Sequence, residues 1–215
     1  MLILTAAFLL CAGTLAAAPL CIFFRIQPKT KVATFNYYQK PGQTDSVIAC
    51  EGKKFPNSIF SVQFTLNKKI NGPYKISSKT RYYIDAGTDH IVNYVPTKKD
   101  LNETDVAGIG KIMRFHKQFQ PNGTNVNFVF CESPNKFYLR TFERGVEAET
   151  LACGTGSMAA VIGRMNLGQK KKLFCKVIQS SKEVLSIKCR MPSQNKIILE
   201  QKGRAKLIFT GTYEL

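Results

Sequence analysis

Apolar residues downstream of residue 26 recur at a period of two or form short runs rich in β-branched and aromatic side chains. This pattern is typical of β-strands. Turn-forming residues separate several of the runs, at Pro41-Gly42, Asn71-Gly72-Pro73 and Pro121-Asn122-Gly123. The pattern predicts strands over Val32–Tyr38, Ser58–Leu66, Thr80–Ile84, His90–Val95, Thr124–Cys131, Phe137–Phe142, Leu173–Ile178, Val184–Cys189, Lys196–Leu199 and Ala205–Phe209.

One helix is predicted on the surface of the protein, beginning near Asn102 or Thr104. Its apolar residues stand at helical spacing with polar residues between them, which indicates a helix with one face on the core. These residues are Val106, Ile109, Ile112 and Met113.

A second predicted helix follows Cys153 and is apolar on every side from Met158 to Ile162. A helix tolerates this composition only when it is buried all round. A sheet must therefore wrap it, and the chain is predicted to be α+β, mostly strands, with a short central helix in its C-terminal half.

The uncharged segment from Met1 to Phe24 allows three interpretations. A secretory signal fits the apolar core and the small residues Ala16-Ala17-Ala18, although no basic residue precedes the core. A membrane-spanning helix needs about 20 apolar residues, and Pro19 interrupts a barely sufficient length. The third interpretation is a buried helix of a soluble domain, opened by Cys11 and Gly13.

Composition places the chain among globular proteins, because 44% of its 215 residues are apolar and 21% are charged. An excess of 31 Lys and Arg over 14 Asp and Glu gives a net charge of +17, which raises nucleic acid, an anionic membrane or an acidic substrate as partner. No nucleic-acid motif accompanies the charge, so we interpret the basic residues chiefly as a solvated face. The seven scattered cysteines favour a reduced compartment.

Cys153 is the first candidate catalytic residue, because Gly154, Thr155 and Gly156 follow it at the start of the buried helix. Free amides at a helix N-terminus form an anion site. The same positive end lowers the pKa of a thiol. The segment therefore predicts a carboxylate site with a thiolate beside it. The alternative is that Cys153 is only a small buried residue.

Glu143 and Arg144 stand just upstream, at the end of a predicted strand. Arg144 can fork onto a carboxylate and Glu143 can accept a hydrogen bond from an ammonium group, so together they can bind both ends of an amino acid. The same dipeptide is also common as a surface ion pair.

The stretch from Glu143 to Gly156 resembles the second cysteine signature of the diaminopimelate epimerase family. Gly123-Thr124-Asn125 and the residues after it resemble the family's Asn-containing strand, and Gly87-Thr88-Asp89-His90 resembles its Gly-Asn-Pro-His segment. The resemblance runs from about Thr80 to the C-terminus.

Membership of this family implies two pseudo-symmetric domains, each a mixed sheet curled around a central helix, with the amino acid bound between them. One thiolate removes the α-proton and a thiol of the other domain delivers a proton to the opposite face. The implied enzyme interconverts LL- and meso-diaminopimelate in lysine and peptidoglycan biosynthesis, without pyridoxal phosphate, metal or other cofactor. The carbanion is stabilised by helix-end amides around the α-carboxylate.

The resemblance also implies roles for individual residues. Cys153 is the acid/base of the second domain, and Glu143 and His90 are the other catalytic candidates there, His90 being the histidine near the catalytic thiols. Thr88 stands where the family usually has a binding Asn. The implied substrate-binding residues are Thr88, Asn125, Glu143, Arg144, Gly154 and Thr155.

The first cysteine signature has no clean copy, and Cys11 is the candidate for it, as the start of a remnant of the first domain's helix. Because 215 residues are too few for two complete halves, we expect an incomplete N-terminal domain (residues 1–78), a C-terminal domain (residues 79–204) and a strand returning to the first domain (residues 205–215). Unpaired strand edges in such a chain favour instability or self-association, including a homodimer.

Three functional hypotheses remain open from the sequence. The first is a cytoplasmic epimerase that uses Cys153 and Cys11 and binds a small amino acid, with neither nucleic acid nor membrane as partner. The second is a non-catalytic relative that only binds an amino acid. The third is a secreted basic protein, in which Asn102 and Asn122 would be glycosylation acceptors.

Overall fold

The computed structural model describes residues 4–11, 32–35, 44–51, 58–67, 70–76, 79–193 and 195–213. The strands are β1 (Leu4–Cys11), β2 (Val32–Phe35), β3 (Thr44–Glu51), β4 (Ser58–Asn67), β5 (Ile70–Ile76), β6 (Lys79–Asp85), β7 (Asp89–Val95), β8 (Asn125–Ser133), β9 (Lys136–Glu143), β10 (Ala148–Thr150), β11 (Lys172–Ile178), β12 (Val184–Ser193) and β13 (Lys196–Tyr213). The helices are α1 (Lys98–Glu103), α2 (Val106–Arg114) and α3 (Gly154–Leu167), with a short 3₁₀ turn at Lys117–Phe119.

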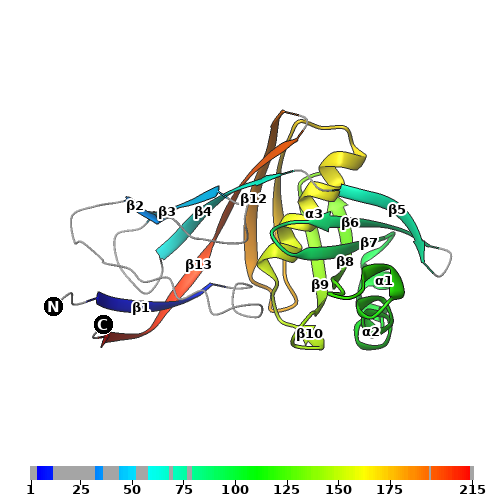
Figure 1. Ribbon diagram of the computed structural model, residues 1–215, viewed down its shortest axis with the longest axis horizontal. Helices are drawn as coiled ribbons and strands as arrows, with labels where there is room; N and C mark the ends of the chain where they lie inside the picture. Colours follow the sequence, from blue (N-terminus) through cyan, green and yellow to red (C-terminus); the bar gives the residue numbers. More distant parts are fainter. Residues whose placement is uncertain are drawn as a thin grey trace.

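The described strands form one curved hydrogen-bonded path in the order β2-β3-β4-β13-β12-β11-β9-β8-β7-β6-β5 (Figure 1). Two strands lie off the path, since β1 pairs with β13 and β10 pairs with β9. Most neighbours are antiparallel, but β7 and β8 are parallel, as are β9 and β11. The sheet is therefore mixed, and the predicted α+β class is confirmed.

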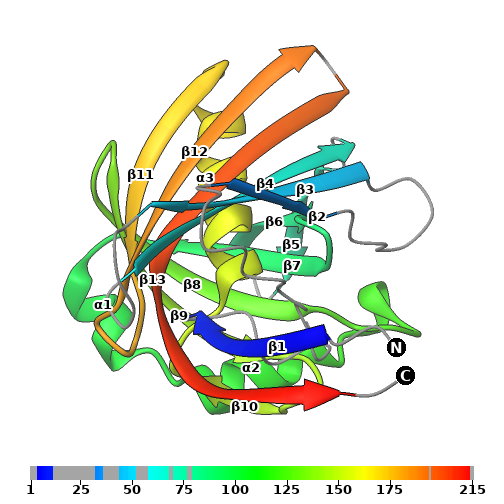
Figure 2. The ribbon, with the colours of Figure 1, turned by 90° about the vertical axis from the view of Figure 1, so that its left-hand side faces the viewer.

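Helix α3 is the centre of the described core, with β6 to β9, β11 and β12 against it (Figures 1 and 2). Its residues from Met158 to Ile162 are at most 2% exposed, which confirms the prediction of a helix buried on every side. Ile84, Leu139, Val177 and Ile187 are among the sheet residues in this core.

Helices α1 and α2 pack on the strands around β8 and form a second, smaller cluster. Helix α2 begins after the N-cap Asp105, whose side chain accepts a hydrogen bond from Gly108 N at 2.9 Å. This agrees with the predicted start. Val106 and Met113 are buried, as the apolar spacing predicted, whereas Ile109 and Ile112 of the same predicted set are 37% and 66% exposed.

The longest strand differs from the prediction. The pattern predicted separate strands at Lys196–Leu199 and Ala205–Phe209, but β13 is continuous over 18 residues. It bends visibly along its length (Figure 2). Its first part lies between β12 and β4, and its last part pairs with β1. Partners along the whole length satisfy the backbone groups that would otherwise end the strand.

Other elements lacked a clear sequence pattern, and the prediction omitted β1, β3, β5, β10 and α1. Asn71-Gly72-Pro73 was predicted as a turn, but it lies inside β5, where the pairing with β6 shifts between Asn71 and Tyr74. Such an irregularity accommodates a proline within a strand. The predicted turn at Pro41-Gly42 lies outside the described residues.

The N-terminal segment contains a strand, Leu4–Cys11, that the sequence analysis did not predict. Cys11 is its last residue and pairs with Ala205 of β13. The helix expected to follow Cys11 falls on residues 12–31, outside the described part. Within the described chain, the structure contains no helix with the length and apolar character needed to cross a membrane.

Candidate active site

Cys153 lies at the N-cap of α3 and is 2% exposed. Its Sγ accepts a hydrogen bond from Gly156 N at 3.3 Å, in the place of the oxygen that usually caps a helix. A Cβ at position 156 would lie 2.4 Å from Asn127 Oδ1 and 3.1 Å from this sulfur. Only glycine therefore allows the helix start to approach β8 so closely.

The backbone of Cys153 is held by Gln179, which is 3% exposed and follows β11. Cys153 N donates to Gln179 Oε1 at 3.1 Å, and Gln179 Nε2 donates to Ser157 Oγ at 2.5 Å. Ser157 Oγ in turn donates to Cys153 O at 2.9 Å. This closed set of hydrogen bonds fixes the first turn of α3 against the sheet.

The protonation state of Cys153 differs from the thiolate that the sequence predicted. The helix terminus was expected to lower the pKa of the thiol, but burial, with a further contribution from the charge of Glu143, raises the pKa to about 12. Hydrogen bonds from the helix end oppose the shift and are outweighed. The free energy lost by burying a thiolate is larger than the stabilisation of the thiolate by the helix N-terminus, so the resting group is a thiol.

A line of polar groups connects Cys153 with the sheet. Cys153 Sγ lies 3.6 Å from Thr155 Oγ1, and Thr88 Oγ1 donates to Thr155 Oγ1 at 3.5 Å. Thr88 Oγ1 also lies 2.9 Å from His90 Nε2. Two threonine hydroxyls therefore stand between the imidazole and the sulfur.

His90 is completely buried and neutral. Asn127 Nδ2 donates to His90 Nδ1 at 2.9 Å, and Asn127 Oδ1 accepts from Thr141 Oγ1 at 3.0 Å, which sets the orientation of the amide. Nδ1 is thus the acceptor, and Nε2 carries the proton toward Thr88 Oγ1. Burial lowers the pKa of His90 to about 3. The imidazole orients its neighbours and does not exchange a proton near neutral pH.

Glu143 is the last residue of β9 and is 4% exposed. Its Oε2 has no hydrogen-bond partner among the described residues. Burial raises the pKa of this carboxyl group. An unpartnered buried carboxylate oxygen beside Cys153 is the kind of acceptor that an ammonium group would satisfy.

Arg144 forms an ion pair within the chain, because its Nη1 lies 3.0 Å from Asp89 Oδ2. The same Nη1 donates to Gly123 O at 3.1 Å. Asn125 links the two backbones, since Arg144 N donates to Asn125 Oδ1 at 2.9 Å and Asn125 Nδ2 donates to Asp89 O at 3.0 Å.

These contacts form two sets, one through Cys153, Thr155, Thr88 and His90 and one through Asn125 and Arg144. They include four residues that the sequence analysis missed. The missed residues are Asp89, Asn127, Ser157 and Gln179. Asn127 had a usable pattern, because it follows Asn125 at strand spacing in an otherwise apolar run. The side chain of Cys11 lies outside the described part, so the structure does not relate it to Cys153.

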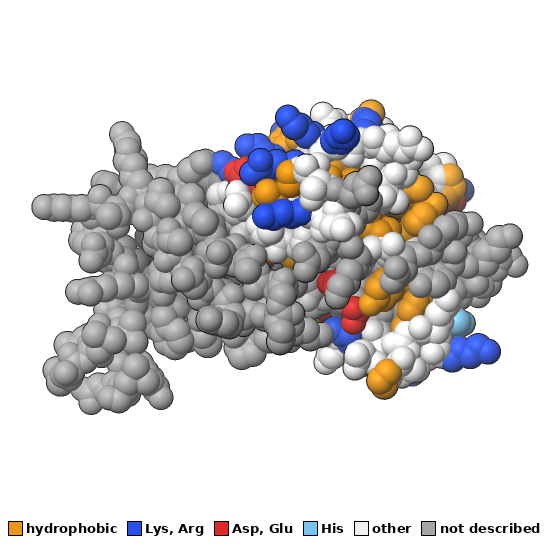
Figure 3. All heavy atoms as spheres, turned by 45° about the horizontal axis from the view of Figure 1, so that its top comes forward, with side chains coloured by type: hydrophobic (Ala, Val, Ile, Leu, Met, Phe, Trp, Pro, Cys, Tyr) orange, Lys and Arg blue, Asp and Glu red, His pale blue; other side chains and the backbone are white. Residues whose placement is uncertain are grey.

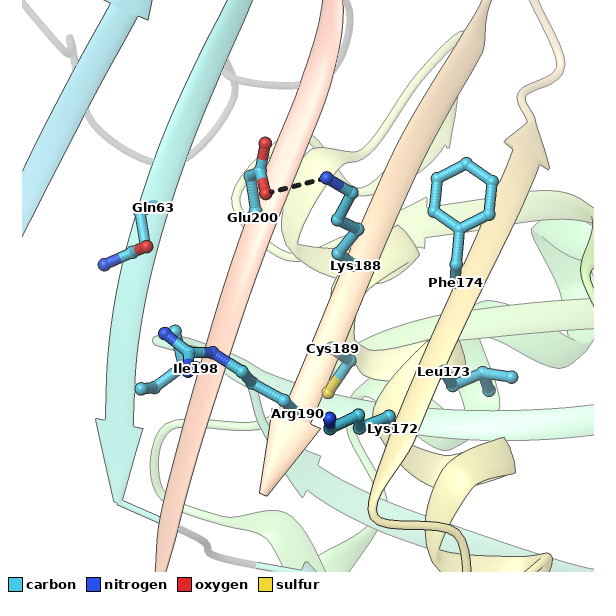
Figure 4. Close-up of a pocket in the computed structure, with 9 residues that line it drawn as sticks. All are labelled: Gln63, Lys172, Leu173, Phe174, Lys188, Cys189, Arg190, Ile198 and Glu200. Carbon is cyan, nitrogen blue, oxygen red and sulfur yellow. Dashed lines mark ion pairs between the residues drawn. The ribbon is translucent and has the colours of Figure 1, made fainter. Parts of the chain in front are cut away.

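A groove of about 470 Å³ lies on another part of the sheet, over β11, β12, β13 and β4 (Figure 4). Phe174, Lys188, Glu200 and Gln63 stand in one row across these strands, and Lys188 Nζ lies 3.4 Å from Glu200 Oε2. Lys and Arg side chains gather on one part of the described surface (Figure 3). Cys153 does not line this groove, which is therefore separate from the candidate site.

In the described part of the chain, no group of three His, Cys, Asp or Glu side chains is placed so that it could hold a metal ion.

Comparison with known proteins adds a sequence match to this geometry. Residues 82–208 match the family described as Diaminopimelate epimerase. A diaminopimelate epimerase from Hydrogenobaculum sp. (strain Y04AAS1) is 38% identical over 148 residues, which cover 65% of this chain and 51% of that protein. One from Aquifex aeolicus (strain VF5) is 47% identical over 105 residues, covering 49% of this chain and 37% of the relative. The chain spans about half the length of these curated relatives or less.

Solved structures give a likeness of fold. A hydroxyproline epimerase from Agrobacterium vitis, with bound trans-4-OH-L-proline, has a TM-score of 0.61 at 13% identity, covering 87% of this chain and 61% of that one. A Bacillus anthracis protein of the PhzF phenazine biosynthesis family has a TM-score of 0.59 at 8% identity, covering 82% and 70%. At these identities the likeness concerns the fold alone.

Proposed function

The chain belongs to the diaminopimelate epimerase family and has its fold, and from this premise we propose that it takes part in epimerising LL- and meso-diaminopimelate by proton transfer between two thiols. The observation that carries the proposal is Cys153, buried at the N-terminus of a fully buried helix inside the matched region. The proposed reaction needs no bound cofactor.

In the proposed reaction Cys153 begins as the proton donor, because its raised pKa keeps it a thiol. A thiolate on the opposite side of the substrate breaks the Cα–H bond and takes the proton. Cys153 then gives its S–H proton to the other face of the α-carbon and is left as a thiolate. The hydrogen bond from Gly156 N to Sγ supports that thiolate, and the return reaction reverses the roles.

The helix end is the proposed site for the α-carboxylate. The first-turn amides of Gly154 and Thr155 lie where a helix has unsatisfied donors and a positive partial charge. Negative charge that develops on the carboxylate as the α-proton leaves would be stabilised there by donors already in position. The Thr155 hydroxyl, 3.6 Å from Cys153 Sγ, lies at the same end of the helix.

The distal end of the substrate is proposed to bind at the charged residues of β9 and the turn after it. Glu143 would accept from the ammonium group through its unpartnered Oε2, and Arg144 would bind the distal carboxylate. Asn125 holds the backbone of Arg144, and Thr88 presents its hydroxyl between His90 and Thr155.

Cys11 remains the proposed second thiol. Supporting it is its place at the end of β1, which pairs with the returning strand β13. We also propose that residues 1–78 and 205–215 belong to the first domain and residues 79–204 to the second; the pairing of β1 with the last part of β13 supports the joining of the two ends.

Exchange in heavy water tests the proposal. Diaminopimelate incubated with the full chain in D₂O should acquire deuterium at its α-carbon, which mass spectrometry detects. Cys153→Ala should lower the exchange rate by a factor of about 100 or more, the usual contribution of a positioned acid or base. Cys11→Ala should do the same if Cys11 is the second thiol.

Cys131→Ala is the matched control, because Cys131 is a free, partly exposed cysteine of β8. Its exchange rate should equal that of the wild type. Exchange that survives in Cys153→Ala would overturn the assignment of the proton donor.

A second candidate function is amino-acid binding without turnover. The raised pKa of Cys153 favours it, because Cys153 must be a thiolate to take a proton in the return reaction and burial disfavours that form. Calorimetric binding of diaminopimelate by the wild type, with no deuterium incorporation, would establish this function in place of the epimerase.

A further inference from the structure

Both carboxylate oxygens of Asp89 accept hydrogen bonds from side chains near the candidate site. Tyr83 Oη donates to Oδ1 at 2.5 Å, and Arg144 Nη1 donates to Oδ2 at 3.0 Å. The side chains of Arg144 and Asp89 are 22% and 21% exposed, so solvent screens this pair less than a surface pair. The three side chains form a short, anchored line that ends on Arg144.

Tyr83 is a stable support for the carboxylate. Its ring stacks on Phe119 with centroids 6.0 Å apart and planes 11° apart. Burial, with the hydrogen bond to Asp89, raises the pKa of Tyr83 far above its usual value. The hydroxyl therefore remains protonated near neutral pH and keeps donating to Asp89.

The contacts of the Arg144 guanidinium are one-sided. In the part of the chain that the structure describes, they run through Nη1, which donates to Asp89 Oδ2, Gly123 O and Asn122 O at 3.0, 3.1 and 3.4 Å. The edge formed by Nε and Nη2 is left for another acceptor. That edge offers two parallel donors, which is the geometry that binds a carboxylate in a bidentate manner.

We propose that Asp89 is a positioning and selectivity residue, which clamps Arg144 through Nη1 so that its Nε/Nη2 edge receives the distal carboxylate of the substrate. The inference rests on the proposed function for the identity of that ligand. In the family segment that Gly87–His90 resembles, Gly-Asn-Pro-His, this place holds a proline, which supplies no carboxylate.

The clamp also has a consequence for selectivity. Asp89 balances the charge of Arg144, and Glu143 is a second acid close by in sequence, at the end of β9. A distal group with a carboxylate and an ammonium suits this set of charges, whereas a distal carboxylate alone adds an unbalanced negative charge. The site should therefore prefer diaminopimelate to 2-aminopimelate, the same diacid without the second amino group.

The clamp is tested first without any ligand. Nitrogen-15 NMR of the full chain should show distinct, slowly exchanging Nη signals for Arg144, assigned by their loss in Arg144→Lys. Asp89→Asn should average these signals, and Tyr83→Phe should do so in part. Glu103→Gln removes the same charge from exposed helix α1 and should leave them unchanged. Unaltered signals in Asp89→Asn would overturn the clamp.

Calorimetry with diaminopimelate and 2-aminopimelate tests the consequence for binding. Asp89→Asn should raise the Kd for diaminopimelate by about tenfold, as expected when a charged hydrogen bond no longer orients the binding group. It should also reduce the preference over 2-aminopimelate, and Asp89→Glu should restore part of it. Where the wild type turns over, the change should appear in KM and leave kcat nearly constant.

The outcomes separate the two proposals. Equal or tighter binding of diaminopimelate by Asp89→Asn would show that Asp89 only competes for Arg144, and would overturn the positioning role. A clamp visible by NMR together with no binding of either ligand by the wild type would reject the proposed function and the selectivity derived from it, and leave the clamp in place.

Discussion

Replacing Gln179 with leucine tests whether the hydrogen bonds behind Cys153 hold the start of α3. Gln179 is 3% exposed and touches both ends of the first turn, through Cys153 N at 3.1 Å and Ser157 Oγ at 2.5 Å. Leucine has a similar size but neither hydrogen-bonding group. The buried amide of Cys153 then loses its acceptor, and Ser157 Oγ retains its bond to Cys153 O.

The expected loss of stability follows from the backbone amide of Cys153, which is left without a hydrogen-bond acceptor. A buried donor without a partner costs about 1–3 kcal/mol, and the lost side-chain bond to Ser157 adds about 1 kcal/mol. The added apolar burial of leucine offsets part of this. We expect Gln179→Leu to lower the free energy of unfolding by about 2 kcal/mol, which corresponds to a fall in Tm of roughly 4–8 °C for a chain of this size.

Urea unfolding followed by circular dichroism measures the change, and the chain provides a matched control. Gln201 is also a buried glutamine, at 6% exposure, but its Oε1 has no hydrogen-bond partner in the described part of the chain. Gln201→Leu should therefore be close to neutral. Ser157→Ala combined with Gln179→Leu should cost less than the sum of the single changes. A Gln179→Leu variant as stable as Gln201→Leu would refute the reasoning.

Three further predictions concern pH and packing. The pKa of His90 is lowered to about 3, so its contribution to stability is present above about pH 6.5 and is lost as pH falls toward 3, by up to about 1.4 kcal/mol per pH unit. Unfolding measured from pH 7 to 4.5 should show a smaller loss of stability in His90→Gln. A variant of the other histidine, His116→Gln, should behave as wild type. The pKa of Cys153 is raised to about 12, so its contribution to stability is present below about pH 9 and is lost as pH rises toward 12. Alkylation of this thiol by iodoacetamide in the folded chain should be slow at pH 8. Rapid labelling at that pH would contradict a buried thiol. Gly156→Ala places a Cβ 2.4 Å from the carboxamide oxygen of Asn127 in β8, and this overpacking should lower the free energy of unfolding by about 1–3 kcal/mol. The control, Gly168→Ala, places its Cβ at an ordinary 3.4 Å from the nearest atom and should change thermal stability little.

Much of the local structure follows from the sequence alone. A run that is apolar on every side specified the buried helix α3, and glycines beside a cysteine marked its N-terminus. Alternating residues predicted β7, β8 and β9, with Glu143 at the end of β9. These features depend on residues close together in the chain, whose backbone preferences and burial are set by neighbouring side chains.

Other elements required partners that no local pattern indicates. Strand β5 contains Asn71-Gly72-Pro73 and forms because β6 pairs with it despite these turn residues. Strand β13 stays continuous because β12 and β4 pair with its first part and β1 pairs with its last part. Pairing with a distant strand satisfies the backbone whatever the local preference of the residues.

The pairing of the site residues and the protonation state of Cys153 also depend on contacts between distant parts of the chain. Arg144 and Asp89 are 55 residues apart in sequence, and Cys153 and Gln179 are 26 apart, so only the folded sheet brings each pair together. The sequence predicted a lowered pKa for Cys153 from the helix that follows it. The strands around that helix remove water from the sulfur and raise the pKa instead. A helix end is a local property, whereas desolvation depends on every element packed around the group.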